Sequence, residues 1–129
     1  MENGPFFSIA HTHNRLYIVV SDMEIGLDCE HRSRSPQYTS IIKKFPLIEQ
    51  DEILSAETFL MHWVVKESAI KFLGGSIAHD LNKFCYHNQQ LSYENKAFPA
   101  RITLLNHEDY LLCVCGNEDF IEPQFVQLT

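Results

Sequence analysis

The chain has 129 residues, 45% of them hydrophobic, and a formal net charge of −7 at pH 7. These values predict a single globular domain spanning residues 1–129. The acidic charge argues against nucleic acid as a partner, and no apolar run approaches the roughly 18 residues that a membrane span needs.

Four cysteines are present and no signal peptide precedes the first predicted strand, so we expect reduced thiols and a cytoplasmic location. Cys113 and Cys115 are two residues apart in the strand-like segment LLCVC, which directs both side chains to one face. Two interpretations are open for this pair: a metal site, or small buried apolar residues in the core.

The N-terminal part begins with three predicted strands, at residues 6–10, 16–20 and 25–30. The links between them are short, which favours one antiparallel sheet whose first two strands form a hairpin. The polar and basic segment that follows predicts a loop over residues 31–40. After this loop, the sequence predicts a short helix over residues 41–45, which a proline ends, and a helical segment over residues 49–54.

The one long helix of the chain is predicted over residues 56–75, AETFLMHWVVKESAIKFLGG. Its apolar residues recur at helical spacing, Ser55 can cap its start, and a Gly-Gly pair ends it. Continuing the apolar stripe brings Glu67 onto the face that should be buried. A lone buried carboxylate costs several kcal/mol, so Glu67 should have a partner, a metal or a shifted pKa. A helix ion pair with Lys71, one turn further on, is the simplest alternative.

Two or three strands are predicted after the helix, from segments at residues 83–87, 100–106 and 110–116 and an optional one at 90–94. The polar segment between the last two predicts the turn of a hairpin, and the residues from Asn117 onward show little pattern. The fold class that follows is α+β, with an antiparallel sheet packed against one long helix.

The third predicted strand, IGLDCE, contains two carboxylates on one face. Asp28 and Glu30 are two residues apart and therefore point to the same side, where their charges repel unless a cation bridges them. Hard oxygen ligands of this kind suit Mg²⁺, and a solvated pair at the end of a strand is the alternative. Gly26 in the same strand leaves room for close approach of another backbone or of a ligand.

Three motifs now occur in one order: SIAHTHNRLYIVVSD at 8–22, IGLDCE at 25–30 and WVVKESAIK at 63–71. Together they resemble the 4′-phosphopantetheinyl transferases, and the Sfp-type members in particular. Those enzymes carry a His-Ser/Thr strand end, then G-x-D-x-E, then W-x-x-K-E-x-x-x-K on a helix. The resemblance covers about residues 5–116 and implies a 4′-phosphopantetheinyl transferase-like half-domain.

The resemblance also implies an activity, that of a holo-acyl-carrier-protein synthase. Such enzymes move the phosphopantetheine arm of coenzyme A to a serine of an apo acyl or peptidyl carrier protein, with Mg²⁺ as cofactor. By this resemblance Asp28, Glu30 and Glu67 are the metal ligands. Glu67, or a water that the metal orders, takes the serine proton, and Asp28 and Lys71 complete the catalytic set. Attack on phosphorus builds up charge on oxygen, so cations have to be in place beforehand.

Further contacts with coenzyme A are implied by the same resemblance. Lys71 and His11 would bind the pyrophosphate, and Lys66 is assigned either a phosphate contact or a structural one. Glu49 falls near a further acidic position of the Sfp-type enzymes.

The chain departs from the Sfp-type pattern in its length. Those enzymes contain two similar halves with coenzyme A between them, whereas this chain resembles the second half alone. The Gly-Lys-Pro pattern before the His motif is reduced to Asn-Gly-Pro at residues 3–5, without the lysine. We therefore expect a homo-oligomer, a dimer or a trimer, with coenzyme A at the subunit boundary. The apolar first strands favour self-association.

Two other interpretations are open. The chain could be a non-catalytic half-domain, a binding or structural subunit that needs a separate partner chain, or it could be an unrelated metal-dependent hydrolase. The three intact acids favour an active transferase, and the missing first half favours the non-catalytic alternative. The sequence offers no hydrolase nucleophile and no His-rich metal set.

Overall fold

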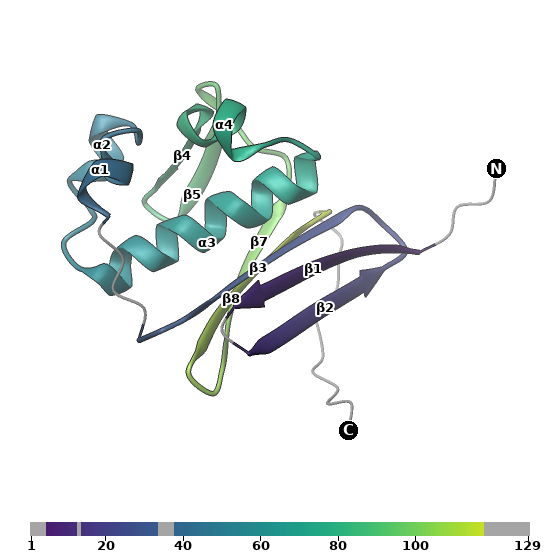
Figure 1. Ribbon diagram of the computed structural model, residues 1–129. Helices are drawn as coiled ribbons and strands as arrows, with labels where there is room; N and C mark the ends of the chain where they lie inside the picture. Colours follow the sequence, from purple (N-terminus) through teal and green to yellow (C-terminus); the bar gives the residue numbers. More distant parts are fainter. Residues whose placement is uncertain (1–4, 13, 34–37, 118–129) are drawn as a thin grey trace.

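The computed structural model describes residues 5–12, 14–33 and 38–117 (Figure 1). Its strands are β1 (Phe6–Thr12), β2 (Arg15–Ser21), β3 (Ile25–His31), β4 (Phe84–His87), β5 (Gln90–Tyr93), β6 (Lys96–Ala97), β7 (Arg101–His107) and β8 (Tyr110–Gly116). Its helices are α1 (Thr39–Ile42), α2 (Leu47–Gln50), α3 (Ala56–Leu73), α4 (Ile77–Asp80) and the short 3-10 helix η1 (Leu81–Lys83). The predicted α+β class, with antiparallel sheets and one long helix, is confirmed.

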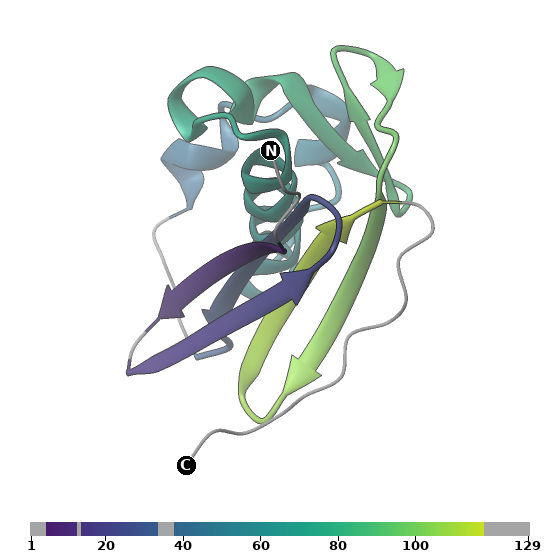
Figure 2. The same ribbon diagram turned by 90° about the vertical axis from the view of Figure 1, so that its right-hand side faces the viewer.

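The central layer is an antiparallel sheet of strand order β3-β8-β7 (Figures 1 and 2). Helix α3 packs on one face of this sheet, and the larger hydrophobic cluster lies between them. The β1–β2 hairpin packs on the other face and encloses a smaller cluster. A second three-stranded sheet, β4-β5-β6, adds its apolar side chains to the cluster around α3. The central strands are therefore covered on both faces.

Strand β8 divides its side chains between the two clusters. Leu111, Cys113 and Cys115 point toward α3, and the residues between them point toward the hairpin. The prediction that the two cysteines share a face is confirmed. Both are fully buried in the core and are not in disulfides, and the Cys113 sulfur accepts a hydrogen bond from the Ser68 hydroxyl at 3.1 Å. Burial raises the pKa of the Cys113 thiol to about 12. This environment favours the core interpretation over a metal site.

Helix α3 begins and ends where its sequence predicts. The Ser55 hydroxyl accepts a hydrogen bond from the backbone N–H of Thr58 at 3.1 Å, which satisfies one of the free donors of the first turn. Gly74 ends the helix in the left-handed conformation, with φ of 76°. Gly26 of β3 faces this helix, because a side chain there would collide with the Ser68 carbonyl oxygen and the Phe72 backbone. The predicted close approach of another backbone is confirmed, and that backbone is α3.

The expectation of one N-terminal sheet is wrong in its pairing. β1 and β2 do form a hairpin, with Phe6 opposite Ser21. However, β3 pairs with β8, which places Ile25 opposite Gly116. Short links favour pairing between neighbours, but β3 is buried on both faces. A strand of this kind belongs in a covered layer, where α3 and the hairpin can each occupy one side.

Each predicted strand is present, with ends shifted by at most two residues. The helical segments expected at 41–45 and 49–54 correspond to α1 and α2, which begin two residues earlier than predicted. Helix α4, the helix η1 and the short strand β6 were missed by the sequence patterns. Residues 34–37 of the expected loop, residues 3 and 4 of the Asn-Gly-Pro segment and the tail from 118 lie outside the described residues. No described helix is long and apolar enough to cross a membrane.

Candidate active site

The G-x-D-x-E strand and the K-E-x-x-x-K helix lie against each other in opposite directions. Gly26 lies against the turn of α3 that contains Ser68. At the other end of the strand, the Arg32 guanidinium pairs with Glu57 in the first turn of α3 at 2.8 Å. Between these two contacts, Asp28 reaches the level of Glu67 and Lys71. Two motifs that are far apart in the sequence therefore meet at one seam.

Asp28 is the most perturbed carboxylate of this seam. Its side chain is buried, and its Oδ2 atom has no hydrogen-bond partner among the described residues. Burial and, to a smaller degree, the charges of Glu67 and Glu30 raise the Asp28 pKa to about 8, with the charge of Lys71 opposing them. An acid held in this way favours a proton or a cation on its free oxygen.

Lys71 provides the positive charge of the seam. Its ammonium nitrogen lies 3.6 Å from the Asp28 Oδ1 atom. The same group donates hydrogen bonds to the carbonyl oxygen of Leu27 at 2.8 Å and to that of Ile9 at 3.1 Å. Lys71 therefore joins the acidic strand to β1, in addition to balancing part of the charge on Asp28.

The other two predicted metal ligands are in the same region but differ in burial. Glu30 is buried, and its Oε1 atom accepts a hydrogen bond from the Thr12 hydroxyl at 3.4 Å. Glu67 is only half-buried, although its charge acts on Asp28. The prediction that Glu67 lies on the buried face of the helix is wrong. The ionisable residues on that face are His62 and Lys66.

The side chains of this seam are of the type that binds a hard cation, but they are not arranged as a metal site. Among residues 5–12, 14–33 and 38–117, no group of three His, Cys, Asp or Glu side chains is arranged so that it could hold a metal ion. The chemistry of the donors fits a hard cation. The charges of Glu30 and Glu67 act on Asp28, and the buried Oδ2 atom of Asp28 lacks a hydrogen-bond donor. Asp28, Glu30 and Glu67 therefore remain the predicted ligands.

His11 lies near the end of β1, on the exposed side of the strand. It shares that side with Ile9, whose carbonyl oxygen is bonded to Lys71. Thr12, the second residue of the His-Thr pair, faces the opposite way and contacts Glu30. The His-Thr motif therefore ends beside the acidic strand, with the imidazole of His11 open to solvent.

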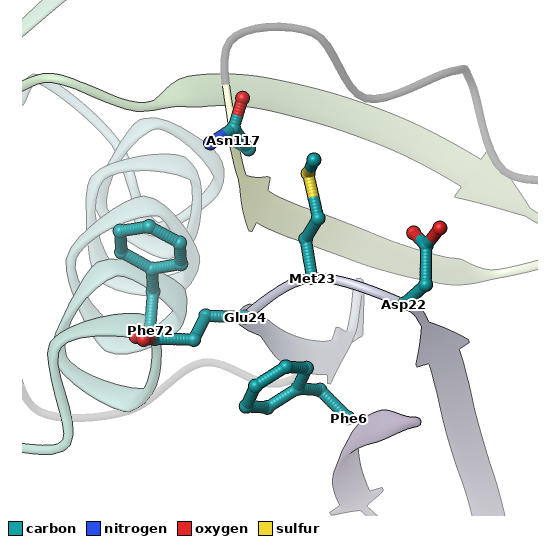
Figure 3. A pocket seen from close by; sticks show the side chains of 6 residues that line it. All are labelled: Phe6, Asp22, Met23, Glu24, Phe72 and Asn117. Atoms are coloured by element: carbon teal, nitrogen blue, oxygen red, sulfur yellow. The ribbon is translucent and has the colours of Figure 1, made fainter. Parts of the chain in front are cut away.

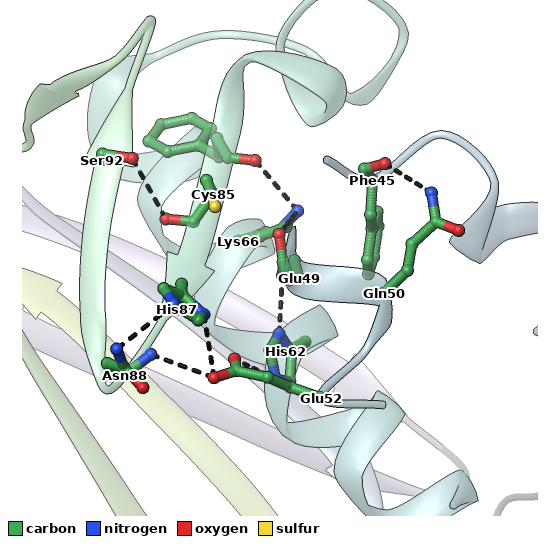
Figure 4. A network of polar contacts seen from close by, with 11 residues as sticks. Phe45, Glu49, Gln50, Glu52, His62, Lys66, Cys85, His87, Asn88 and Ser92 are labelled. Atoms are coloured by element: carbon green, nitrogen blue, oxygen red, sulfur yellow. Dashed lines mark hydrogen bonds and ion pairs between the residues drawn. The ribbon is translucent and has the colours of Figure 1, made fainter. Parts of the chain in front are cut away.

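Lys66 has a structural contact, the second of the two interpretations offered for it. Its side chain is fully buried, and its ammonium nitrogen lies 2.7 Å from the Glu49 Oε1 atom (Figure 4). It also donates to the Phe84 carbonyl oxygen at 3.0 Å and lies 3.6 Å from the centre of the Phe45 ring. Burial lowers the Lys66 pKa, and the charge of Glu49 opposes that shift. Enclosed in this way, Lys66 cannot reach a phosphate of a ligand.

A network that the sequence reasoning missed surrounds this lysine (Figure 4). The second oxygen of Glu49 lies 2.6 Å from Nδ1 of His62, and His87 pairs with Glu52 at 2.9 Å. One signal was available in the sequence. His62 and Lys66 are four residues apart on an apolar helix, so both point to the same buried face and require an acid there.

A shallow pocket of about 330 Å³ opens between the C-terminal end of α3 and the start of β3 (Figure 3). The described residues that line it are Phe6, Asp22, Met23, Glu24, Phe72 and Asn117. Two of these are carboxylates and none is a cation, so the pocket does not suit a phosphate group.

Comparison with known proteins adds no assignment to this geometry. A scan against protein-family models found no match, and a search of curated proteins found none.

Proposed function

We propose that the chain is a Mg²⁺-dependent 4′-phosphopantetheinyl transferase that modifies a serine of an apo carrier protein. The observation that carries this proposal is the Asp28 carboxylate, which is buried between two motifs and whose free oxygen lacks a donor. A buried acid among other acids is an unfavourable arrangement for a purely structural role. It is the arrangement expected where a divalent cation and a pyrophosphate bind.

In this proposal each residue of the seam has a separate task. Asp28 and Glu30 are ligands of the ion, which when bound would neutralise charge on the pyrophosphate. Glu67, half-buried and so open to the substrate, accepts the proton of the carrier serine as its oxygen attacks phosphorus. Lys71 binds a pyrophosphate oxygen, and His11 binds the same group from β1. Adenosine 3′,5′-bisphosphate leaves.

A single copy is short of cations for this ligand. Lys66 is enclosed by Glu49 and Phe84, so Lys71 is the only cation of the K-E-x-x-x-K motif that remains for the pyrophosphate. Coenzyme A carries a 3′-phosphate in addition to that pyrophosphate. We therefore propose that the active form is a homo-oligomer that binds coenzyme A at the subunit boundary.

Transfer can be tested directly by mass spectrometry. The protein is incubated with coenzyme A, Mg²⁺ and an apo carrier protein, and the carrier should gain the mass of the phosphopantetheine arm. Asp28→Asn and Glu67→Gln should abolish transfer because each removes a charge that the reaction needs. Asp51→Asn, a matched substitution at an exposed position, should leave transfer unchanged. Near-wild-type transfer by Asp28→Asn would refute the assignment of the site.

One observation favours a second candidate, the non-catalytic half-domain. Within the described part of the chain, no metal-binding group is assembled, so a separate partner chain could be needed to complete the site. A folded protein that gives no transfer with any apo carrier tested, and shows no heat of Mg²⁺ binding, would favour this candidate.

A further inference from the structure

The outer face of the β1–β2 hairpin is an exposed apolar surface. It consists of three cross-strand pairs: Phe7 with Val20, Ile9 with Ile18, and His11 with Leu16. We call these six residues the hairpin face. Its five apolar residues are between 46% and 65% exposed. Side chains at alternate positions of a strand share one side, so these residues form a continuous surface.

The opposite side of the same hairpin is already part of the core. Ala10 is buried, and Tyr17 and Val19 pack against the central sheet. The hairpin is thus apolar on both sides, a pattern that belongs to strands covered on both faces. A contiguous exposed apolar surface of several hundred Å² often marks an interaction site.

We propose that the hairpin face is the contact surface of a two-fold symmetric dimer of this chain. No Asp, Glu, Lys or Arg lies on the hairpin face, although the chain carries a net charge of −7. A strongly charged partner would find no counter-charge here. A second copy presents an equally uncharged surface of the same shape, and the repulsion between two acidic molecules is smallest where both approach through uncharged patches.

The area of the hairpin face is adequate for such a contact. Its apolar side chains expose on the order of 100 Å² each, so the face offers roughly 500 Å² per copy and about 1,000 Å² for a pair, at the lower limit of specific interfaces. Two hairpins can pack face to face as sheets do, with side chains interleaved between them. The pair formed by Ile9 and Ile18 is the middle one of the three, so a two-fold axis near it would bring Ile18 close to its own copy.

The dimer would also place two candidate sites beside the contact. His11 belongs to the hairpin face, and the Ile9 carbonyl oxygen is bonded to Lys71. A ligand held by Lys71 and His11 would therefore lie at the edge of the second copy. Only this placement of coenzyme A rests on the proposed function; the dimer itself rests on the hairpin face alone.

Sedimentation of the full chain tests the proposal. At tens of micromolar the wild-type protein should sediment as a dimer, and Ile18→Glu should sediment as a monomer because the charge would be buried at the centre of the contact. Leu54→Glu provides the matched control, since Leu54 is 85% exposed and lies outside the hairpin face. It should remain dimeric. If Ile18→Glu fails to fold, Ile18→Thr keeps the strand propensity and should weaken the dimer at least tenfold.

Two results would overturn the proposal. The first is a monomeric wild-type protein, and the second is a dimer that Ile18→Glu and Ile18→Thr leave intact. Raising the salt concentration should strengthen the predicted dimer, because it screens the repulsion between two acidic copies. Asp28→Asn should stay dimeric while losing transfer, which separates failure of the dimer from failure of the proposed function.

Discussion

Two neighbouring residues of helix α3, Lys66 and Glu67, belong to two different clusters of ionisable side chains. The clusters differ in how completely their charges are balanced. Lys66 is fully buried with one carboxylate of Glu49, a carbonyl oxygen and an aromatic ring around its ammonium group. On the other side of the helix, Asp28 lies among further carboxylates with Lys71 as the nearby cation. Burial of a charge is therefore not itself a sign of function. The incomplete balance at Asp28 is the informative feature.

The largest expected effect is a loss of stability when Lys66 loses its counter-charge. Glu49→Ala should lower the free energy of unfolding by about 3–5 kcal/mol, because it leaves the buried Lys66 ammonium without its counter-charge. Urea unfolding measures this loss. Glu57→Ala, which breaks an exposed ion pair with Arg32, should cost less than about 1 kcal/mol. An equal loss in both variants would show that the buried pair of Glu49 and Lys66 contributes no more to stability than an exposed one.

Asp28→Asn should increase the stability of the protein, whereas Glu49→Ala decreases it. The pKa of Asp28 is about 8 in the folded protein, above its ordinary value of 3.8. The folded state therefore binds this proton more tightly, so the contribution of Asp28 to stability is greatest below pH 4 and falls as the pH rises toward 8. Asp28→Asn should raise the free energy of unfolding by about 1–3 kcal/mol at pH 9.

Unfolding curves at several pH values, recorded with a chelator present, check this second prediction. The two proteins should differ little at pH 4 and most at pH 9. Lower stability of the variant at pH 9 would mean that the Asp28 carboxylate is adequately paired in the folded state.

Mg²⁺ should stabilise the folded protein by balancing the negative charge around Asp28. An ion that binds only the folded state at ten times its Kd adds about 1.4 kcal/mol to the free energy of unfolding. This gain should appear in the wild-type protein and in Glu49→Gln, and it should be absent in Asp28→Asn. Thermal melts with and without Mg²⁺ measure it, and an equal gain in all three proteins would place the ion elsewhere.

The smallest expected effect concerns Lys71. Lys71→Ala should weaken coenzyme A binding by about 1 kcal/mol, roughly fivefold, because a partly exposed ammonium contributes modestly to phosphate binding. Lys96→Ala, at an exposed position outside the seam, should leave the affinity unchanged. Calorimetry that finds the same affinity for Lys71→Ala and the wild-type protein would limit Lys71 to its contacts with Leu27 and Ile9.

Local features of this fold could be predicted from the sequence because local physics decides them. The cap at Ser55, the stop at Gly74 and the ends of the strands depend on neighbouring residues. The pairing of β3 with β8 does not, because it joins two strands that are far apart in the sequence and depends on the burial of β3 on both faces. Short links alone favoured the wrong neighbour.

The candidate site could also be predicted only in its local features. The alternation in IGLDCE placed Asp28 and Glu30 on one side, and both are directed away from the apolar cluster under the hairpin. The sequence could not decide between Lys66 and Glu67 as the buried residue of α3. That choice depends on Glu49, which enters the core from α2 to meet the lysine.

The attachment of β1 to β3 has a consequence for hydrogen exchange. The Ser8 side-chain oxygen accepts the Leu27 N–H at 3.0 Å, and the Lys71 side chain bonds the Ile9 and Leu27 carbonyl oxygens. This attachment relies on side-chain hydrogen bonds, whereas β3 and β8 share a full backbone ladder. The hairpin amides should therefore exchange with deuterium through a partial opening that costs less than global unfolding. A phosphate bound to Lys71 would compete with the Ile9 and Leu27 carbonyl oxygens for the same ammonium group. Ligand binding should therefore change how often the hairpin opens.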